Sequence, residues 1–212
     1  MSNGTCILEA REGRPDPAVF ARIAAILGSG GTVVYPTDTF YALGAAADSP
    51  AGVEKVYRLK DRDRGKPLSV VAADFAMAKA CTDAPSALFE SLPRKFWPGP
   101  LTLIVKARPG FPPAMLGPGG SIAVRVPGLA WLRDLLAHFG RPVTATSANI
   151  SGEAEISSGL EAVRRFAGKV DLIVDGGDTP GGLPSTIVDV VAVPPRIARA
   201  GAVPAAALSP FL

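Results

Sequence analysis

The segment GTVVYPTDTFYALG, residues 31–44, combines an expected β-strand with a polar turn. Its β-branched and aromatic residues at 32–35 favour a strand, which Pro36 ends because proline lacks an amide hydrogen for the sheet. The polar residues TDT at 37–39 follow at once, before a second extended piece at 40–43. Short polar side chains at a strand end have a rigid support and can face a ligand. The segment therefore predicts a sheet with a polar site at its edge.

Helical and extended patterns alternate along the rest of the chain, which is typical of an α/β fold. Helices are expected at residues 16–28, 49–60, 75–80, 86–89, 129–139 and 158–166. Further strands are expected at 68–72, 101–105, 121–126, 143–146, 172–174 and 186–191. Pro and Gly interrupt the pattern at 96–100 and 108–120, so we expect a mixed sheet rather than a purely parallel one.

Capping residues mark several of the expected helix ends. Asp16-Pro17 and Ser49-Pro50 each look like an N-cap followed by a first-turn proline, and Gly140 closes a helix. Ser158 with Glu161 has the spacing of a capping box. No internal repeat or break in composition interrupts this organisation. We therefore expect one domain over residues 1–212, with a short tail at 203–212.

Composition limits the class of protein. The 212 residues are 48% hydrophobic, which is ample for a core, yet no apolar run reaches the roughly 18 residues that a membrane span needs. Residues 1–14 contain no apolar leader segment, and Cys6 and Cys81 lack metal-ligand spacing. These features favour a reduced, cytoplasmic setting without a membrane. The net charge of +3 permits an anionic ligand but does not by itself indicate nucleic acid.

Several kinds of catalysis are excluded by what the chain lacks. Its single histidine, His138, ends an expected helix, where a favourable helix-end charge is the common role. A serine–histidine triad is thus disfavoured, and a histidine-based metal centre is excluded by count. Neither a P-loop nor a Gly-x-Gly-x-x-Gly fingerprint is present. An enzyme built from this chain would depend on positioning and electrostatics.

Charge is concentrated at residues 58–66, where five basic and two acidic residues give +3, the net charge of the whole chain. Within this cluster, Arg62 offers a planar fork for phosphate oxygens and Lys60 a compact charge. Residues two apart diverge on a regular helix, so both would face one ligand only at a helix end or in a loop. The alternative is a solvated helix end, where Lys and Arg are favoured by the helix dipole.

Other polar residues stand at predicted strand ends. Ser147 and Asn149 follow one strand, Arg125 ends another, Ser185 precedes a third and Arg199 lies near the C-terminus. Each has an ordinary alternative, namely a turn or cap for Ser147 and Asn149, a flexible turn for Ser185, and a surface charge for either arginine. Their convergence at one rim would make a site for a nucleotide and a small polar substrate.

Seven motifs in order resemble the threonylcarbamoyl-AMP synthase family with its YrdC-like domain, over roughly residues 15–202. The motifs are YPTDTFY (35–41), LKDR (59–62), GKPL (65–68), FWPGPLT (96–102), AVRVP (123–127), TSANISG (146–152) and PSTIVD (184–189). The resemblance implies an open, twisted mixed α/β sheet with helices on both faces and a large basic concave site. It implies a nucleotidyltransferase that forms L-threonylcarbamoyl-AMP and pyrophosphate from ATP, L-threonine and bicarbonate, with Mg²⁺.

By the same resemblance, the product serves the N6-threonylcarbamoyl modification of adenosine 37 in tRNA, through hand-off to a transferase machinery and with possible tRNA contact. It also implies residue roles. The residues implied for ATP are Lys60, Arg62, Ser121, Ser147, Asn149 and Arg199, with Lys60 and Arg62 as the catalytic pair. Those implied for threonine or its carbamate are Thr37, Arg125 and Ser185. No residue is assigned to metal.

The chain departs from the family pattern at Ala42, Asp63, Val70-Val71 and Glu155, which bears mainly on the threonine side. Two alternatives to the synthase remain open. One is a YrdC-like paralogue that binds tRNA or double-stranded RNA without catalysis, although aromatics are only 7% and the basic cluster is compact. The other is adenylation of a different carbamate, as in the similar domain of hydrogenase-maturing carbamoyltransferases, whose acylphosphatase and zinc-finger segments do not appear here.

Overall fold

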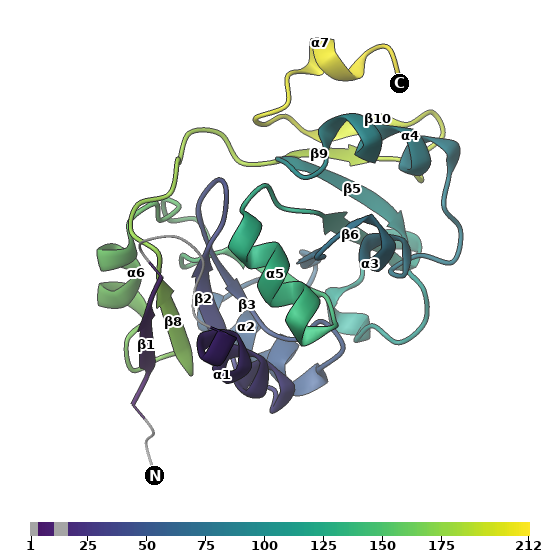
Figure 1. Ribbon diagram of the computed structural model, residues 1–212. Coiled ribbons are helices and arrows are strands. Elements are labelled where there is room, and N and C mark those ends of the chain that lie inside the picture. The colour runs from purple at the N-terminus through teal and green to yellow at the C-terminus, as the bar shows by residue number, and fades with distance from the viewer. Residues whose placement is uncertain (1–3, 11–16) are drawn as a thin grey trace.

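The computed structural model describes residues 4–10 and 17–212, and within them it forms a single ten-stranded sheet (Figure 1). The strand order is β1-β8-β2-β3-β7-β4-β6-β5-β9-β10. The strands are β1 (Cys6–Glu9), β2 (Val33–Pro36), β3 (Tyr41–Gly44), β4 (Ser69–Val71), β5 (Leu101–Lys106), β6 (Ser121–Arg125), β7 (Val143–Ser147), β8 (Leu172–Asp175), β9 (Thr186–Asp189) and β10 (Arg196–Arg199). The sheet contains parallel pairs such as β4–β6 and antiparallel pairs such as β3–β7, which confirms the expected mixed sheet.

Helices cover both faces of this sheet, as expected (Figure 1). They are α1 (Pro17–Gly28), α2 (Pro50–Lys60), α3 (Phe75–Lys79), α4 (Ala87–Phe96), α5 (Ala130–Phe139), α6 (Gly159–Phe166) and α7 (Ala205–Leu208), with 3₁₀ turns at Pro113–Met115 and Pro118–Gly120. Alternate strand residues point to opposite faces. In β2, Val33 packs with α1 and α5, whereas Val34 packs with α2 and α6. Two apolar cores thus hold one sheet between them.

Local sequence explains where α2 begins and ends. The Ser49 hydroxyl accepts a hydrogen bond from the Gly52 amide at 3.2 Å, as an N-cap does. Asp61 then adopts a left-handed conformation, with φ of 47°, and ends the helix. The chain therefore leaves the helix between Lys60 and Arg62, so that Lys60 is the last residue of α2 and Arg62 belongs to the turn that follows.

Some element predictions need correction. The predicted capping box is wrong, because the Ser158 side chain makes no capping hydrogen bond at the start of α6. The helix predicted at 86–89 continues as α4 to Phe96 and accommodates Pro93 in its interior. The predicted N-cap at Asp16 lies outside the described residues. Strands β1 and β10 and helix α7 were not predicted, since each has only four residues and too little periodicity to stand out.

In the part of the chain that the structure describes, no helix combines the length and apolarity that crossing a bilayer requires.

The two cysteines differ in their expected reactivity. Cys81 is buried, and desolvation raises the pKa of its thiol to about 11, whereas Cys6 on the edge strand β1 is partly exposed. A thiolate is the reactive form, so Cys81 should be inert near neutral pH. We expect Ellman's reagent at pH 8 to modify one thiol per native chain rapidly and the second only after unfolding. Rapid modification of both thiols in native protein would contradict this burial.

Candidate active site

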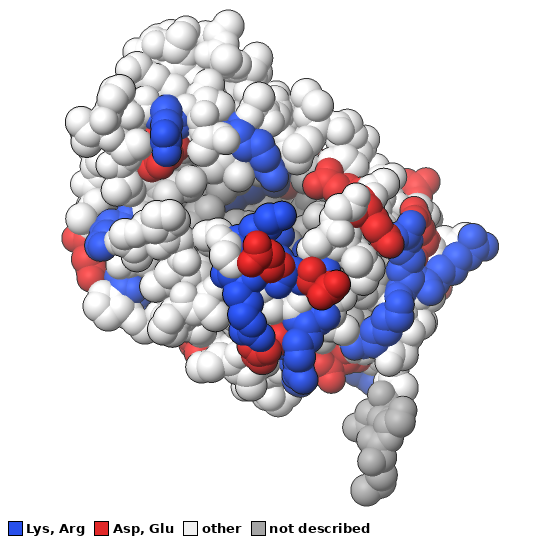
Figure 2. Space-filling model, turned by 180° about the vertical axis from the view of Figure 1, so that it is seen from behind, with Lys and Arg blue, Asp and Glu red and all other residues white. Residues whose placement is uncertain are grey.

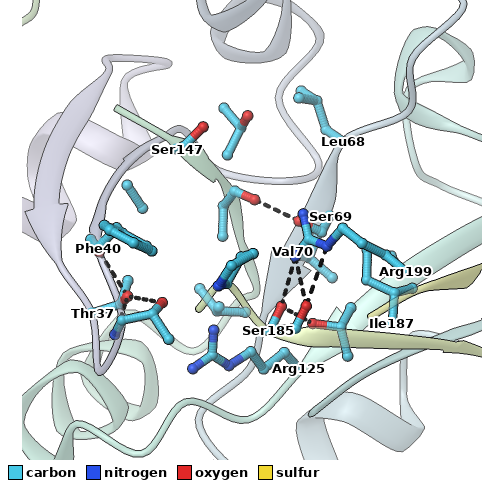
Figure 3. Close-up of a pocket in the computed structure, with 18 of the residues that line it drawn as sticks. Thr37, Phe40, Leu68, Ser69, Val70, Arg125, Ser147, Ser185, Ile187 and Arg199 are labelled. Carbon is cyan, nitrogen blue, oxygen red and sulfur yellow. Dashed lines mark hydrogen bonds between the residues drawn. The ribbon is translucent and has the colours of Figure 1, made fainter. Parts of the chain in front are cut away.

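A cavity of about 320 Å³ opens where the polar turn after β2 meets the ends of several strands. Figure 2 shows Lys and Arg side chains gathered beside a hollow on this face of the molecule, and Figure 3 shows the side chains that line it. Three arginines and one glutamate line the cavity, with Thr37, Ser147 and Ser185 among the hydroxyl groups. The charged lining residues are Arg62, Arg125, Arg199 and Glu155. The donor set therefore fits an anionic ligand with additional polar groups.

The polar turn after β2 forms the first wall. The Thr37 hydroxyl donates to the Phe40 carbonyl at 2.7 Å and accepts from the Thr39 amide at 3.1 Å. These local bonds fix the Thr37 rotamer at the cavity edge, as short hydroxyl side chains often do in turns (Figure 3). The Phe40 ring lines the cavity beside them.

The opposite wall is built around Ser185, just before β9. The Ser185 hydroxyl lies 2.8 Å from that of Thr102 on β5, because β5 and β9 run parallel with Leu101 opposite Thr186. Arg199, at the end of β10, donates to the Ser185 carbonyl at 2.7 Å and to its hydroxyl at 3.2 Å (Figure 3). The edge hairpin β9–β10 thus delivers two predicted site residues as one unit.

Arg125 lies at the C-terminal end of β6, where its guanidinium extends toward Thr37 (Figure 3). Its Nε donates to the Gly99 carbonyl at 2.9 Å. Its NH2 lies 2.6 Å from Oδ1 of Asp38 in the polar turn. The side chain is only 9% exposed, so a positive charge is held deep in the cavity with one acidic partner.

Lys60 is placed beneath the cavity, and only 1% of it is exposed. Its ammonium donates to the carbonyls of Ser147 and Asn149 at 2.5 and 2.7 Å and to Asn149 Oδ1 at 2.7 Å. These three acceptors match the three hydrogens of an ammonium group. Burial, with the nearby charge of Arg62, lowers the pKa of Lys60 to about 8, while Glu155 opposes that shift. Lys60 is therefore a brace for the turn that carries Ser147.

The same turn is closed by its own side chains. The Ser147 hydroxyl donates to Asn149 Oδ1 at 2.6 Å, and the Asn149 amide donates to the Glu153 carbonyl at 2.6 Å. Ser147 lines the cavity, whereas Asn149 is buried behind it. The amide of Asn149 therefore supports the wall from behind.

The basic cluster at 58–66 is divided by the fold. Arg62 lines the cavity and also donates to the carbonyls of Lys66 and Pro67, at 3.1 and 2.9 Å. Arg64 instead pairs with Glu54 on the surface at 2.5 Å. Arg58 is exposed and lies 4.0 Å from the same carboxylate. Arg62 is thus the one cation of the cluster that lines the cavity. Arg58 and Arg64 fit the alternative, which was a solvated helix end.

Ser121 lies at the N-terminal end of β6, four residues from Arg125. Strand alternation places it on the same face of the sheet as Ala123 and Arg125, but it does not line the cavity. Thr37, Arg62, Arg125, Ser147, Ser185 and Arg199 are the predicted site residues that do.

Sequence reasoning gave no role to several cavity residues. Glu155 was noted only as a departure, and Asp38, which contacts the cavity residue Arg125 without lining the cavity, only as part of the polar turn. Thr102 lies within an otherwise apolar strand. Its side chain is buried, and its hydroxyl pairs with that of Ser185. Its polar side chain in an otherwise apolar run was the available signal, since a buried hydroxyl needs a partner. Among the described residues, no group of three or more His, Cys, Asp or Glu is placed to hold a metal ion.

Comparison with known proteins agrees with this architecture. The threonylcarbamoyl-AMP synthase of Pyrococcus abyssi (strain GE5 / Orsay) is 35% identical over 184 residues, 86% of this chain and 54% of that protein. The structure of P. abyssi Sua5 complexed with L-threonine has a TM-score of 0.92 and 32% identity, covering 97% of this chain and 60% of that one. The structure of E. coli YciO has a TM-score of 0.87 and 26% identity, covering 98% and 100%.

This chain spans about half the length of the curated relatives it matches. The family model for Sua5, YciO and YrdC proteins, which is described as "Telomere recombination", matches residues 25–201. The matched range includes every cavity residue named above. On this evidence, the chain belongs to the Sua5/YciO/YrdC family.

Proposed function

We propose that this protein forms L-threonylcarbamoyl-AMP and pyrophosphate from ATP, L-threonine and bicarbonate. The observation that carries the proposal is the convergence of three arginines with the hydroxyls of Thr37, Ser147 and Ser185 on one cavity. Support comes from the fold, which matches P. abyssi Sua5 in complex with L-threonine at a TM-score of 0.92. The curated relatives with 33–35% identity carry the name threonylcarbamoyl-AMP synthase.

At the amino-acid end, Arg125 binds the threonine carboxylate, because a guanidinium fork matches a carboxylate in shape and charge. The hydroxyls of Thr37 and Ser185 lie on either side of the cavity and hold the polar groups of threonine or its carbamate. The hydrogen bonds that lock Thr37 and Ser185 limit the rearrangement needed on binding.

At the nucleotide end, Arg62 and Arg199 neutralise phosphate charge, and Ser147 donates to a phosphate oxygen. Lys60 and Asn149 act through the turn that presents Ser147, since the ammonium of Lys60 is already bonded to that turn. Ser121 extends the nucleotide end along the same face of β6. The donor set of the cavity suits anions, so Mg²⁺ arrives with the triphosphate of its substrate rather than on a protein cage.

The chemistry needs no side-chain nucleophile. The threonine amine attacks the carbon of bicarbonate, and loss of water leaves a carbamate. A carbamate oxygen then forms a bond to the α-phosphorus of ATP as the bond to the pyrophosphate oxygen breaks. Such transfers depend on alignment and on charge neutralisation, which arginines and hydroxyls supply. This accounts for a cavity rich in cations whose described lining contains no histidine or cysteine.

The product is a reactive mixed anhydride, so it requires prompt transfer to an acceptor. We assign that acceptor to the tRNA threonylcarbamoyl transferase machinery, which modifies adenosine 37. Contact with tRNA at the exposed Arg58 and Arg64, on either side of Arg62 in the sequence, belongs to the same proposal.

The test is a pyrophosphate assay with identification of the nucleotide by mass spectrometry. With ATP, Mg²⁺ and bicarbonate, L-threonine should elicit pyrophosphate release and a threonylcarbamoyl-AMP peak. Serine and alanine, offered in place of threonine, test selectivity, and omission of bicarbonate should abolish the product. If pyrophosphate release does not depend on threonine, the proposal fails. Salt-sensitive tRNA binding without any adenylate would then favour an RNA-binding role instead.

A further inference from the structure

The ion pair between Arg125 and Asp38 is buried and incompletely hydrogen-bonded. NH2 of Arg125 and Oδ1 of Asp38 lie 2.6 Å apart, and their side chains are 9% and 18% exposed. Both atoms are fully buried, yet neither makes a hydrogen bond of acceptable geometry. Because Nε is bonded to the Gly99 carbonyl and NH2 is buried against Asp38, the remaining terminal nitrogen, NH1, has bonding capacity left for a ligand.

The other contacts of Arg125 hold its direction. Nε is taken by the Gly99 carbonyl at 2.9 Å, in the bend before β5. Asp38 holds the NH2 side of the fork from the turn after β2. Arg125 lines the cavity and Asp38 does not. Asp38 thus holds the guanidinium without being part of the cavity lining.

Gly128 makes room for this carboxylate. A Cβ built on Gly128 would lie 2.7 Å from Oδ2 of Asp38, which is closer than real Cβ atoms approach, and 3.1 Å from its Cγ, which is tighter than most. The place of Asp38 is therefore set from two sides, by the charge of Arg125 and by the bare backbone at residue 128.

Charge makes Asp38 necessary for the orientation of Arg125. Arg199 also lines the cavity. Burial lowers the pKa of Arg199, the carboxylate of Glu155 opposes that shift, and the positive charge of Arg125 adds to it. A buried guanidinium that faces another cation with no acidic partner would turn toward solvent. The negative charge of Asp38 compensates that of Arg125, so the guanidinium stays in the cavity.

We propose that Asp38 is a positioning residue that aims Arg125 at the carboxylate of the amino-acid substrate, and that the Asp38–Arg125 pair selects substrates with a free carboxylate. This inference rests on the proposed function of the same cavity. It assigns a role to an acidic side chain next to a site for anions. Asp38 acts through Arg125 and contacts no reacting atom.

Two variants separate charge from position. Asp38→Asn removes the charge and retains the shape, whereas Gly128→Ala retains the charge and displaces the carboxylate. Asp48→Asn is the matched control, because Asp48 forms an exposed pair with Arg141 away from the cavity. Thermal unfolding of each variant reports whether it folds, and Gly128→Ala keeps the test available if Asp38→Asn does not.

The readout compares L-threonine with L-threoninol, which lacks the carboxylate. Calorimetric binding of each compound, and steady-state kinetics with L-threonine, are measured for all four proteins. Asp38→Asn should raise the KM for threonine by about tenfold and leave the KM for ATP within about twofold. The preference for threonine over threoninol should shrink by a similar factor. Gly128→Ala should change the KM for threonine and this preference in the same directions, but by less. Asp48→Asn should match the wild type.

The outcomes distinguish this inference from the proposed function. If wild-type protein neither binds threonine nor releases pyrophosphate with it, both are overturned. If wild-type protein is active and Asp38→Asn keeps the full preference for threonine over threoninol, the positioning role is overturned alone. Tighter threonine binding by Asp38→Asn would also overturn it, because Asp38 would then be a competitor for Arg125.

Discussion

Replacing Lys60 with methionine is expected to slow adenylate formation by about a hundredfold, because the turn that carries Ser147 loses its brace. Methionine fills a similar volume but donates no hydrogen bond. The Asn149 carbonyl would lose its donor in a buried position, and the Ser147 carbonyl and Asn149 Oδ1 would each lose one. Unsatisfied buried acceptors cost about 1–3 kcal/mol, so the free energy of unfolding should fall by about that amount. Urea denaturation and the pyrophosphate assay measure the two effects.

Arg58→Met is the matched control for this variant. Arg58 lies on the same helix and carries the same charge, but it is exposed and its nearest acidic group is 4.0 Å away. Surface ion pairs of this kind contribute little, so Arg58→Met should stay within about 0.5 kcal/mol of the wild type and keep its activity. Equal effects of the two substitutions would show that net charge, rather than the brace, matters.

Lys60 also gives a signature in the pH dependence of stability. Its pKa is about 8 in the folded protein, below the ordinary value of 10.5. Between pH 8 and 10.5, Lys60 is protonated in the unfolded chain but not in the folded protein, so the free energy of unfolding rises with pH across this interval. This added stability is lost as the pH falls through 8. The difference in unfolding free energy between wild type and Lys60→Met should therefore widen from pH 8 to 10.5. A constant difference over that interval would contradict the lowered pKa.

Substituting Gly201 with alanine is expected to destabilise the fold by about 1–3 kcal/mol and to impair activity together with it. The new methyl group would clash with the Pro184 carbonyl and lie 2.7 Å from the backbone of both Ser185 and Thr186. That backbone is held by a hydrogen bond from the Ala202 amide to Pro184 at 2.9 Å and by a bond between Thr186 and Val203. Relief of the clash must separate these segments and move Ser185.

Gly4→Ala serves as the control for this substitution, because no atom lies within 4 Å of the added methyl group. It should leave both the denaturation midpoint and the pyrophosphate rate unchanged. For Gly201→Ala, stability and the kinetic constants for both substrates should change together, since Ser185 and Arg199 move as one unit. A variant with wild-type stability would show that the close approach at Gly201 is unimportant.

Much of the cavity could be predicted from strand ends. Thr37, Arg125 and Ser147 each stand at or after the end of an expected strand, Ser185 stands just before one, and all four line the cavity. The alternation of helices and strands, the N-cap at Ser49 and the C-cap at Gly140 were also readable, because these signals depend on residues only a few positions apart.

How deeply each charged side chain is buried could not be predicted from strand ends. Lys60 and Arg64 belong to one short basic cluster, yet Lys60 is buried under the cavity and Arg64 pairs with Glu54 on the surface. The difference depends on acceptors near residue 148, almost ninety positions along the chain. Asp38 likewise could not be assigned, because its partner Arg125 lies on a distant strand.

The sequence by itself therefore determined the class of fold, the order of most elements, the family resemblance and the residue types available for a reaction between anions. Those properties depend on periodicity, capping and short motifs, which are local. Only the tertiary structure decided which cations face the cavity, which brace it from beneath, and why glycine is needed at positions 128 and 201. A side chain's burial, its partner and the space around its backbone depend on segments that become neighbours only when the sheet assembles.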